Sequence, residues 1–490
     1  MLDNINDRLR KSELAIVFIA SAIATLALRW HQLDMPLFYG DEISYSALSY
    51  HLHQTRFHVL GDPGNLEIFH PYLYYVFLAV LTLTLGWKMQ VLHGAALLTS
   101  SLLVTAVYAL ARRHASRSTS MMAAVGFILS RLYLSRAVSI EPDFSAAAFS
   151  LLALLSLLGN SLKLGSLFFA MSCFCNGPVV IFAPCFAHAL SRRIPKRRLT
   201  PALIRFFAPA FFGLAAWCVY FAIAVPGVEG SFGPFDPKEN FGFIRGFRYV
   251  LNQLLGDWTY IIFIDSGRAI ISTAILGGIA WGLKRRQAGD RNRPNLEEDR
   301  LSALGMIFVQ LLFLGFFGPV DPRYATISSA LIYVLGAWVL TEMKAALPIR
   351  AAMLAAVSTL SLLDWNTPAK TNPWNAYRSS YIEQVRNMQK LIKALERESP
   401  GAAVYARWPW ATMLESPRSG YAARPFETVI LQDVADADRI QIPKVSEKKA
   451  FLLSSPGDPL PAAIELRKRA TGPCRSWATP HSKFDLCPLN

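Results

Sequence analysis

Long runs of apolar residues, separated by short polar connections, fill the first three quarters of the chain. The longer runs reach the roughly 20 residues that an α-helix needs to cross a hydrocarbon core about 30 Å thick. A half-apolar stretch from Pro71 to Trp87 is interpreted as a re-entrant or interfacial helix. The pattern predicts an all-α polytopic membrane domain of about 11 to 13 transmembrane helices. The runs fall at about 14–30, 90–111, 119–135, 144–159, 164–175, 178–190, 203–225, 262–283, 301–318, 324–341 and 348–363.

The character of the sequence changes at Asp364, where an Asn- and Pro-rich linker begins. Residues 378–398 then show the spacing of an amphipathic helix, with apolar residues every three or four positions. Short runs typical of β-strands follow. The sequence therefore predicts a membrane domain over residues 1–363 and a small C-terminal α/β domain over residues 364–490. The strand-like runs are at 402–406, 428–431 and 450–454.

The composition excludes a water-soluble globular protein, because 53% of the residues are hydrophobic and only 17% are charged, whereas soluble domains are about a quarter charged. A net charge of +15 suggests nucleic-acid binding, but the basic residues are concentrated in short loops between apolar runs. Such loops face the cytoplasm by the positive-inside rule. The basic clusters are Arg112, Arg113 and Arg117; Arg192, Arg193, Lys196, Arg197 and Arg198; and Lys284, Arg285, Arg286, Arg291 and Arg293.

The positions of these basic loops predict a multi-pass protein of the inner (plasma) membrane with a cytoplasmic N-terminus. The first apolar run lacks a clear cleavage site, so we interpret it as an uncleaved first helix. A large outer loop would then cover residues 31–88. The loops at about 136–143, 226–261 and 319–323 and the C-terminal domain would also be extracytoplasmic.

The six cysteines fall into two groups. Cys173, Cys175, Cys185 and Cys218 lie in apolar runs, where a cysteine usually behaves as a small buried hydrophobe. Cys474 and Cys487 lie in the outer C-terminal domain, an oxidising space in a bacterial cell, where they either form a disulfide or remain free thiols.

Two polar motifs lie in the predicted large outer loop. The first, Gly40-Asp41-Glu42, places an acidic pair in the first turn of a probable helix, where the helix dipole favours negative charge. These carboxylates either cap a surface helix, or deprotonate an acceptor hydroxyl or hold a divalent cation. The second motif, Phe69-His70-Pro71, puts a histidine at the membrane boundary. There His70 is either solvated or close to a phosphate head group.

Two further motifs follow later in the chain. Arg136, Glu141 and Asp143 form a polar patch at an outer turn, although Pro142 with flanking acidic residues also describes an ordinary helix start. In the second motif, Arg323 and Tyr324 follow Asp321 between two apolar runs. The Arg323 guanidinium either grips a phosphate oxygen or pairs only with Asp321.

Two other arginines, Arg131 and Arg268, lie in or next to apolar runs, where their charge must be accommodated. An arginine near the centre of a bilayer costs about 2.5 to 3.5 kcal/mol unless it snorkels or pairs. For Arg131 we expect snorkelling, and the position of Arg268 at or near the predicted outer side is compatible with an ordinary lipid head-group anchor. The predicted topology places all four polar motifs on one face, which suggests a shared cavity for a lipid-borne anionic substrate.

The four motifs together resemble those of the GT-C superfamily of membrane glycosyltransferases, in the branch of protein O-mannosyltransferases and the lipid A aminoarabinose transferase. The resemblance covers most of residues 1–345. Gly40-Asp41-Glu42 is similar to the family's first acidic motif, and Phe69-His70-Pro71 to its basic residue followed by proline. Glu141-Pro142-Asp143 is similar to the second acidic turn, and Arg323-Tyr324 to a late Arg-Tyr motif.

The resemblance implies an inverting glycosyltransferase that uses a polyprenyl-phosphate sugar donor and no nucleotide cofactor. Asp41 would be the general base, assisted by Glu42, and His70 and Arg323 with Tyr324 would bind the donor phosphate. Glu141, Asp143 and Arg136 would bind the acceptor or a cation. His70 stands where many members have lysine.

The resemblance leaves the metal requirement open, with Asp41, Glu141 and Asp143 as candidate ligands. The acceptor would be a glycan, lipid or protein, and membrane lipid is a further partner. No nucleic acid is expected. One alternative is a transporter or flippase of lipid-linked sugars, which would carry charged residues inside spans on broken helices. Another is a membrane-anchored scaffold that acts through residues 375–490.

Overall fold

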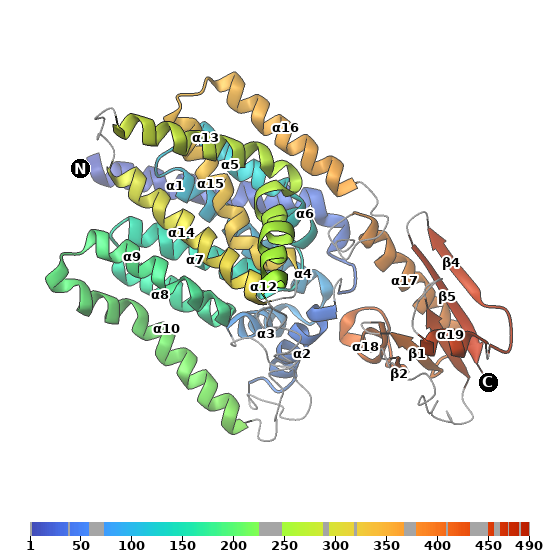
Figure 1. The fold of residues 1–490 in the computed structure, drawn as a ribbon. Coiled ribbons are helices and arrows are strands. Elements are labelled where there is room, and N and C mark those ends of the chain that lie inside the picture. The colour runs from blue at the N-terminus through green and yellow to red at the C-terminus, as the bar shows by residue number, and fades with distance from the viewer. Residues whose placement is uncertain are drawn as a thin grey trace. The chain divides into compact units, whose positions relative to one another are not determined.

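The computed structural model describes most of the chain as helices, followed by a small sheet (Figure 1). Its contacts divide the chain into a membrane unit (Met1–Trp30, Gly61–Leu78 and Ala95–Trp365) and a second unit (His31–Leu60, Ala79–Gly94 and Asn366–Asn490). The described residues are 2–37, 40–57, 73–224, 247–287, 294–317, 321–366, 379–407, 410–431, 449–454, 461–468, 470–479 and 482–489.

The membrane unit is built from the helices that the apolar runs predict. Among the described residues, six helices are long and apolar enough to cross a membrane, or seven if one bent pair forms a single span. Shorter apolar helices accompany them, so the total number of crossings stays a prediction. The helices lying wholly or mostly in this unit are α1 (Leu2–Arg29), α4 (Met89–Ala111), α5 (Arg117–Ile128), α6 (Arg131–Arg136), α7 (Pro142–Leu158), α8 (Leu162–Cys175), α9 (Ala183–Arg193), α10 (Lys196–Ala224), α12 (Phe247–Asn252), α13 (Arg268–Gln287), α14 (Pro294–Phe317), α15 (Thr326–Glu342) and α16 (Leu347–Asn366).

Two expected spans are broken by residues that start a new helix. The run at 119–135 is two helices, because Ser130 caps α6 by accepting a hydrogen bond from the Tyr133 amide. The run at 178–190 is also divided, into the 3-10 turn η2 (Gly177–Phe182) and α9, each with a proline at its start. Proline has no amide hydrogen to donate, so it fits well in the first turn of a helix, where that hydrogen has no partner within the helix.

The bent pair is formed by residues Arg248–Ile264 and Arg268–Ala280, which meet at 93°. The break, η5 (Asp265–Gly267), ends at Gly267 with a φ of +77°. A side chain would be strained in this conformation, and a Cβ here would lie 3.1 Å from the carbonyl oxygen of Val357 in α16. The glycine thus permits both the sharp turn and the close approach of α16.

Small residues let the membrane helices pack closely, as is typical where lipid supplies no hydrophobic driving force. A Cβ on Gly278 of α13 would lie only 2.3 Å from a methyl group of Val339 in α15. Gly336 of α15 meets Ile271 of α13 in the same way, at 2.5 Å. These two glycines therefore fix the distance between α13 and α15.

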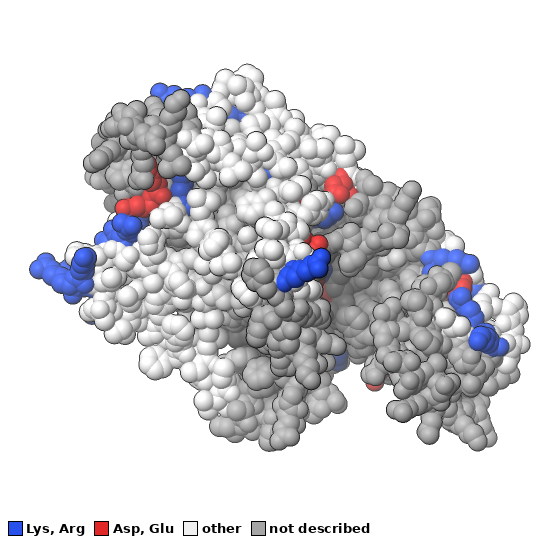
Figure 2. Space-filling view, in the orientation of Figure 1, with Lys and Arg blue, Asp and Glu red and all other residues white. Residues whose placement is uncertain are grey.

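One buried carboxylate joins two of the three basic clusters at one end of the membrane unit. Asp299 of α14, which is 0% exposed, accepts hydrogen bonds from Arg113, from His114 at 2.6 Å and from Arg193 at 2.5 Å. The ends of α4 and α9 therefore lie together, as the positive-inside rule requires of loops on one side of a membrane. On the face shown in Figure 2, the described surface of this unit is largely uncharged, with basic residues gathered near the turn between α9 and α10.

The C-terminal part of the second unit is the predicted α/β domain. It holds a five-stranded sheet in the order β2-β1-β3-β5-β4, with β1 parallel to β2 and β3, and β5 antiparallel to β3 and β4. The predicted amphipathic helix and the three predicted strands are confirmed. The elements are α17 (Ser379–Glu398), β1 (Ala403–Arg407), α18 (Trp410–Glu415), the turn η8 (Pro417–Ser419), β2 (Glu427–Leu431), β3 (Ala450–Ser454), α19 (Pro461–Lys468), β4 (Arg475–Thr479) and β5 (Ser482–Leu489).

A disulfide links Cys474, just before β4, to Cys487 in β5. Both sulfur atoms lie in or against the apolar core of the sheet, beside Leu452 and Leu489. The four remaining cysteines are free, and all but the exposed Cys218 are buried.

The start of the loop predicted to be extracytoplasmic, residues 31–88, belongs to the same unit as the C-terminal domain. Its helix α2 (Gly40–Gln54) packs against α18 and η8. The Leu37 amide donates to the carbonyl oxygen of Ser419 at 2.9 Å, and Gly420, at a φ of +82°, lies against Pro36. Loop and domain therefore fold onto each other. Helix α3 (Leu73–Leu85), expected as the interfacial helix, has 13 residues and is divided between the two units.

Candidate active site

A buried ion-pair cluster joins three segments of the membrane unit that are distant in the sequence. Arg136 ends α6, Glu141 precedes α7, and Arg323 lies in the turn η6 (Pro322–Ala325) before α15. Oε1 of Glu141 accepts hydrogen bonds from Nη1 of Arg136 and, at 2.9 Å, from Nη1 of Arg323. These three residues are 4 to 5% exposed. Because buried charges need partners, the carboxylate holds both cations in place.

Asp321 and Tyr324 complete the cluster around Arg323. Asp321 Oδ2 lies 3.5 Å from Nε of Arg323 and 3.6 Å from Nη2 of Arg136. Nη2 of Arg323 donates to the Tyr324 hydroxyl at 3.0 Å. Gln310 of α14 donates to the Tyr324 carbonyl oxygen at 2.6 Å. Arg323 therefore does not pair only with Asp321, since it also binds Glu141.

Asp143 makes a contact that the sequence did not predict. Asn176, at the junction of α8 and η2, donates to Oδ1 of Asp143 at 3.1 Å. Both residues are buried, and within the described structure Oδ1 of Asn176 has no hydrogen-bond partner. The signal that could have found Asn176 is its place in the sequence, because Asn176-Gly177-Pro178 interrupts an otherwise apolar stretch.

Local structure explains why the acidic residues gather at the start of α7. Pro142 occupies the first turn, where its missing amide hydrogen is not needed. Glu141 and Asp143 flank it at the positive end of the helix dipole, which stabilises negative charge. The helix-start interpretation of this motif is therefore confirmed, and Glu141 also belongs to the ion-pair cluster.

Arg131 belongs to a second buried network, and the expectation that it snorkels is wrong. Its Nη2 lies 2.9 Å from Asp265 Oδ1 and its Nη1 lies 2.8 Å from Asp364 Oδ2, with the Arg131 side chain 3% exposed. Pairing therefore accommodates the charge. The sequence could not indicate this, because Asp265 and Asp364 are distant along the chain.

The interpretation of Arg268 as a lipid head-group anchor is wrong as well. Arg268 is 0% exposed, lies 3.3 Å from Asp265 and donates to the carbonyl oxygen of Ile261. Asp265 therefore binds two arginines at the break before α13. It was missed because a single acidic residue at the edge of an apolar run is also typical of a surface turn.

The remaining predicted residues lie in other parts of the chain. Asp41 falls in the first turn of α2, as expected, but the placement of its side chain is not described. Glu42 is fully buried in the second unit. His70 lies outside the described residues. A meeting of Asp41, Glu42 and His70 with the Glu141 cluster stays a prediction.

The described residues include no group of three or more His, Cys, Asp and Glu side chains that could hold a metal ion. Glu141 fits a divalent cation poorly, because two guanidinium groups already occupy its carboxylate and would repel a second positive charge. Asp143 and Asp41 remain candidate ligands.

The whole fold is similar to that of ArnT from Cupriavidus metallidurans. The crystal structure of ArnT in the apo state is 13% identical, with a TM-score of 0.58, and the match covers 97% of this chain and 98% of that chain. The structure of ArnT bound to undecaprenyl phosphate is 12% identical, with a TM-score of 0.57 and coverage of 96% and 97%. The chain therefore has an ArnT-like fold, in agreement with the predicted helical membrane domain followed by a small α/β domain. No protein-family model and no curated protein matches the sequence.

Proposed function

We propose that the chain is an inverting glycosyltransferase that moves a sugar from a polyprenyl-phosphate donor to an acceptor on the extracytoplasmic face of the membrane. The observation that carries the proposal is the cluster of Arg136, Glu141 and Arg323, buried at the ends of three helix-bearing segments. It belongs to a chain whose fold matches ArnT along nearly its whole length. That relative was crystallised with undecaprenyl phosphate, a lipid of the class proposed here as donor.

In the proposed reaction, Asp41 removes the proton of the acceptor hydroxyl while its oxygen attacks the anomeric carbon of the donor sugar. The bond between that carbon and the phosphate oxygen breaks, and the polyprenyl phosphate leaves with the bonding electrons. Negative charge grows on the leaving phosphate, and Arg323 and His70 would stabilise it. Preorganised cations in a water-poor site are effective here because they need no rearrangement during the reaction.

We assign different roles to the acidic residues. Glu141 binds two arginines, so we assign it to holding their guanidinium groups in place. Asp143 and Asn176 form the polar pair that could bind an acceptor hydroxyl or a cation. Glu42, buried next to Asp41 in α2, would orient the general base.

The test replaces the proposed base. A strain in which the gene for this protein is deleted should lack one sugar on a cell-envelope glycan, lipid or protein. Expression of the wild-type protein should restore that sugar, which is detected by mass spectrometry of the envelope molecules. The Asp41→Asn variant should reach the membrane in equal amount and restore less than about 1% of the modification, because general-base catalysis contributes about 10²- to 10⁴-fold. Asp34→Asn, which alters an exposed aspartate of the same outer loop, is the matched control. Normal modification by Asp41→Asn would reject the assignment.

A transporter of lipid-linked sugars is the second candidate function. The break between α12 and α13 carries buried charged residues at Asp265 and Arg268, which is the arrangement that many transporters use for binding. Purified protein in vesicles separates the two functions. A transporter would move a labelled polyprenyl-phosphate sugar across the bilayer with Asp41→Asn in place, whereas a transferase would require Asp41 and an acceptor.

A further inference from the structure

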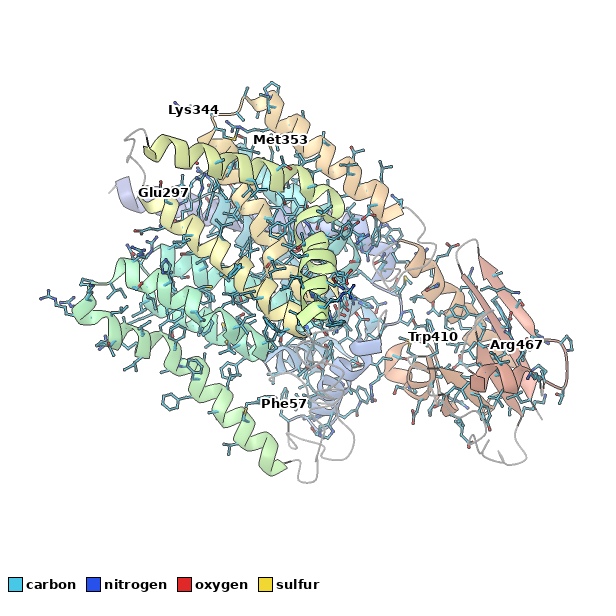
Figure 3. The ribbon with its side chains drawn as sticks, viewed as in Figure 1. Phe57, Glu297, Lys344, Met353, Trp410 and Arg467 are labelled. Atoms are coloured by element: carbon cyan, nitrogen blue, oxygen red, sulfur yellow. A yellow bond between two sulfur atoms is a disulfide. The ribbon has the colours of Figure 1, made fainter. Side chains whose placement is uncertain are left out.

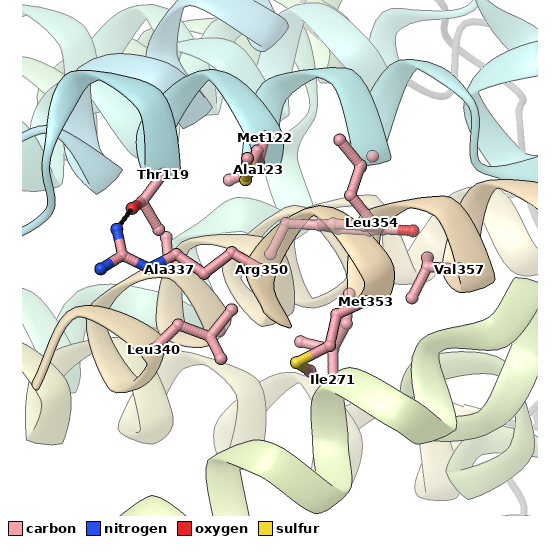
Figure 4. A pocket seen from close by; sticks show the side chains of 13 residues that line it. Thr119, Met122, Ala123, Ile271, Ala337, Leu340, Arg350, Met353, Leu354 and Val357 are labelled. Atoms are coloured by element: carbon pink, nitrogen blue, oxygen red, sulfur yellow. Dashed lines mark hydrogen bonds between the residues drawn. The ribbon is translucent and has the colours of Figure 1, made fainter. Parts of the chain in front are cut away.

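An apolar groove lies between α5, α13, α15 and α16 of the membrane unit (Figure 4). Its unfilled space, counted together with the solvent at its open side, is about 430 Å³. Gly126 of α5 and Gly336 of α15 also line it, and each is packed against a neighbouring side chain, Tyr333 and Ile271 respectively. Apolar side chains make up most of the wall, so the groove suits a hydrocarbon chain rather than water. The main apolar side chains are Met122, Ile271, Leu340, Met353, Leu354 and Val357.

Arg350 lies at one end of this groove, and its hydrogen bonds to described residues are all to neutral groups. Its Nη1 donates to the Thr119 hydroxyl at 2.6 Å and to the Ser116 hydroxyl at 3.4 Å, and its Nε donates to the Ala345 carbonyl oxygen at 2.7 Å. No acidic side chain in the described part of the chain forms an ion pair with it. Its positive charge is thus fixed beside an apolar channel and is not neutralised there.

A second cation lies at the same end of the membrane unit. Lys344 is exposed in the turn between α15 and α16, six residues before Arg350, and Figure 3 shows it near the end of α16 that carries Met353. It too forms no ion pair with a described acidic residue. Two cations beside the apolar groove match a lipid whose head group is negatively charged and whose acyl chain is apolar.

The groove is distinct from the candidate active site. Helix α15 begins next to Arg323 and ends at Glu342, so Leu340 in the groove is 17 positions beyond Arg323. At 1.5 Å per residue Leu340, at the end of the groove that holds Arg350 (Figure 4), lies about 25 Å from Arg323 along the helix, and Tyr333, the groove residue nearest to Arg323 along α15, lies about 15 Å from it. The lipid in the groove would therefore not be the donor that reacts at Arg323.

We infer that the groove binds one acyl chain of an anionic phospholipid, with its phosphate against Arg350 and Lys344. The lipid comes from the leaflet on the side of the turn between α15 and α16. Its chain supplies packing that α16 otherwise lacks, since only 11% of the apolar window of this helix is buried in the protein. It would hold α16 against α5 and α15.

Native mass spectrometry of the purified full-length protein tests this inference. With phosphatidylglycerol and phosphatidylcholine at equal concentration, the wild-type protein should retain one phosphatidylglycerol in preference. Arg350→Gln should reduce that preference by about five-fold, the factor expected for one cation near a membrane surface. Arg350→Lys keeps the charge and should keep the preference.

Two further variants separate the groove from general charge effects. Leu354→Trp adds bulk inside the groove and should reduce retention of the lipid without changing the charge. Arg198→Gln removes an exposed arginine from the first turn of α10 and is the matched control. The proposal is overturned if Arg350→Gln retains phosphatidylglycerol as the control does, or if Leu354→Trp binds it like the wild type. Size-exclusion chromatography of each variant establishes that it is folded, and neither result depends on glycosyltransferase activity.

Discussion

Removal of the Glu141 carboxylate would leave two buried guanidinium groups without the anion they share. The longer contacts of Arg136 and Arg323 with Asp321, at 3.6 Å and 3.5 Å, would remain. The Glu141→Ala variant therefore exposes both the loss of two charge-assisted hydrogen bonds and the cost of an uncompensated buried charge. Glu141→Gln keeps the size of the side chain and one acceptor oxygen while it removes the charge.

The size of the effect follows from the burial of the cluster. Breaking a buried ion pair by removing one partner costs about 3 to 5 kcal/mol, so Glu141→Ala should lower the free energy of unfolding by that amount. Glu141→Gln should cost about half as much, since the amide oxygen still accepts one hydrogen bond. In the double variant Glu141→Gln/Arg323→Gln, the Arg323 guanidinium that lost the Glu141 charge is also removed. Its cost should be smaller than the sum of the single costs by at least about 1 kcal/mol.

Unfolding of the purified chain in mixed micelles, followed by tryptophan fluorescence while a denaturing detergent is added, gives these free energies. Asp257→Asn, which alters an exposed aspartate bonded only to Gln253 among the described residues, is the control and should change stability by less than about 0.5 kcal/mol. Additive costs of Glu141→Gln and Arg323→Gln would show that the two side chains do not interact. The assignment of Glu141 as the residue that positions Arg323 would then be wrong.

Two further predictions concern the second network and the disulfide. Asp265→Ala should destabilise the membrane unit by about 3 to 5 kcal/mol in the same unfolding measurement, because it leaves Arg131 and Arg268 short of a partner; a cost no larger than that of Asp257→Asn would contradict the network. Cys474→Ser/Cys487→Ser should cost the C-terminal domain about 3 kcal/mol, since the disulfide closes a loop with a sequence separation of 13. The loss of stability should appear as faster proteolysis of that domain than in the wild-type protein. Cys218→Ser, which alters an exposed free cysteine, is the control. If the double variant and this control are cleaved at the same rate, the prediction is wrong.

Local patterns in the sequence were enough to predict those helices and strands in which buried residues recur at regular spacing. In α17 the buried residues Val385, Met388, Leu391, Ile392 and Leu395 follow the helical spacing that predicted it. Strands β4 and β5 were missed because their residues do not resemble a buried strand. Pro488 lies within β5 and cannot donate a ladder hydrogen bond, so its sequence argued against a strand.

The candidate site was predictable as a set of residues but not as a set of contacts. Arg136, Glu141, Asp143 and Arg323 stand out because charged residues are rare at the ends of apolar runs. Their pairing depends on packing between segments, with Arg323 lying 182 positions from Glu141. The same limit explains the wrong expectation for Arg131, since snorkelling can be judged from one helix alone and pairing cannot.

The short helix α6 explains why the buried charges form two networks rather than one. Arg131 and Arg136 are its first and last residues, and five positions at 100° each place their side chains about 140° apart around the helix axis. One face therefore meets Asp265 and Asp364, and another meets Glu141. Because both ends of α6 are held by buried ion pairs, Arg136 has little freedom to shift when an anionic substrate arrives. Arg136 and Arg323 share the carboxylate of Glu141, so the fixed position of Arg136 also helps to preorganise Arg323 for the proposed stabilisation of a leaving phosphate.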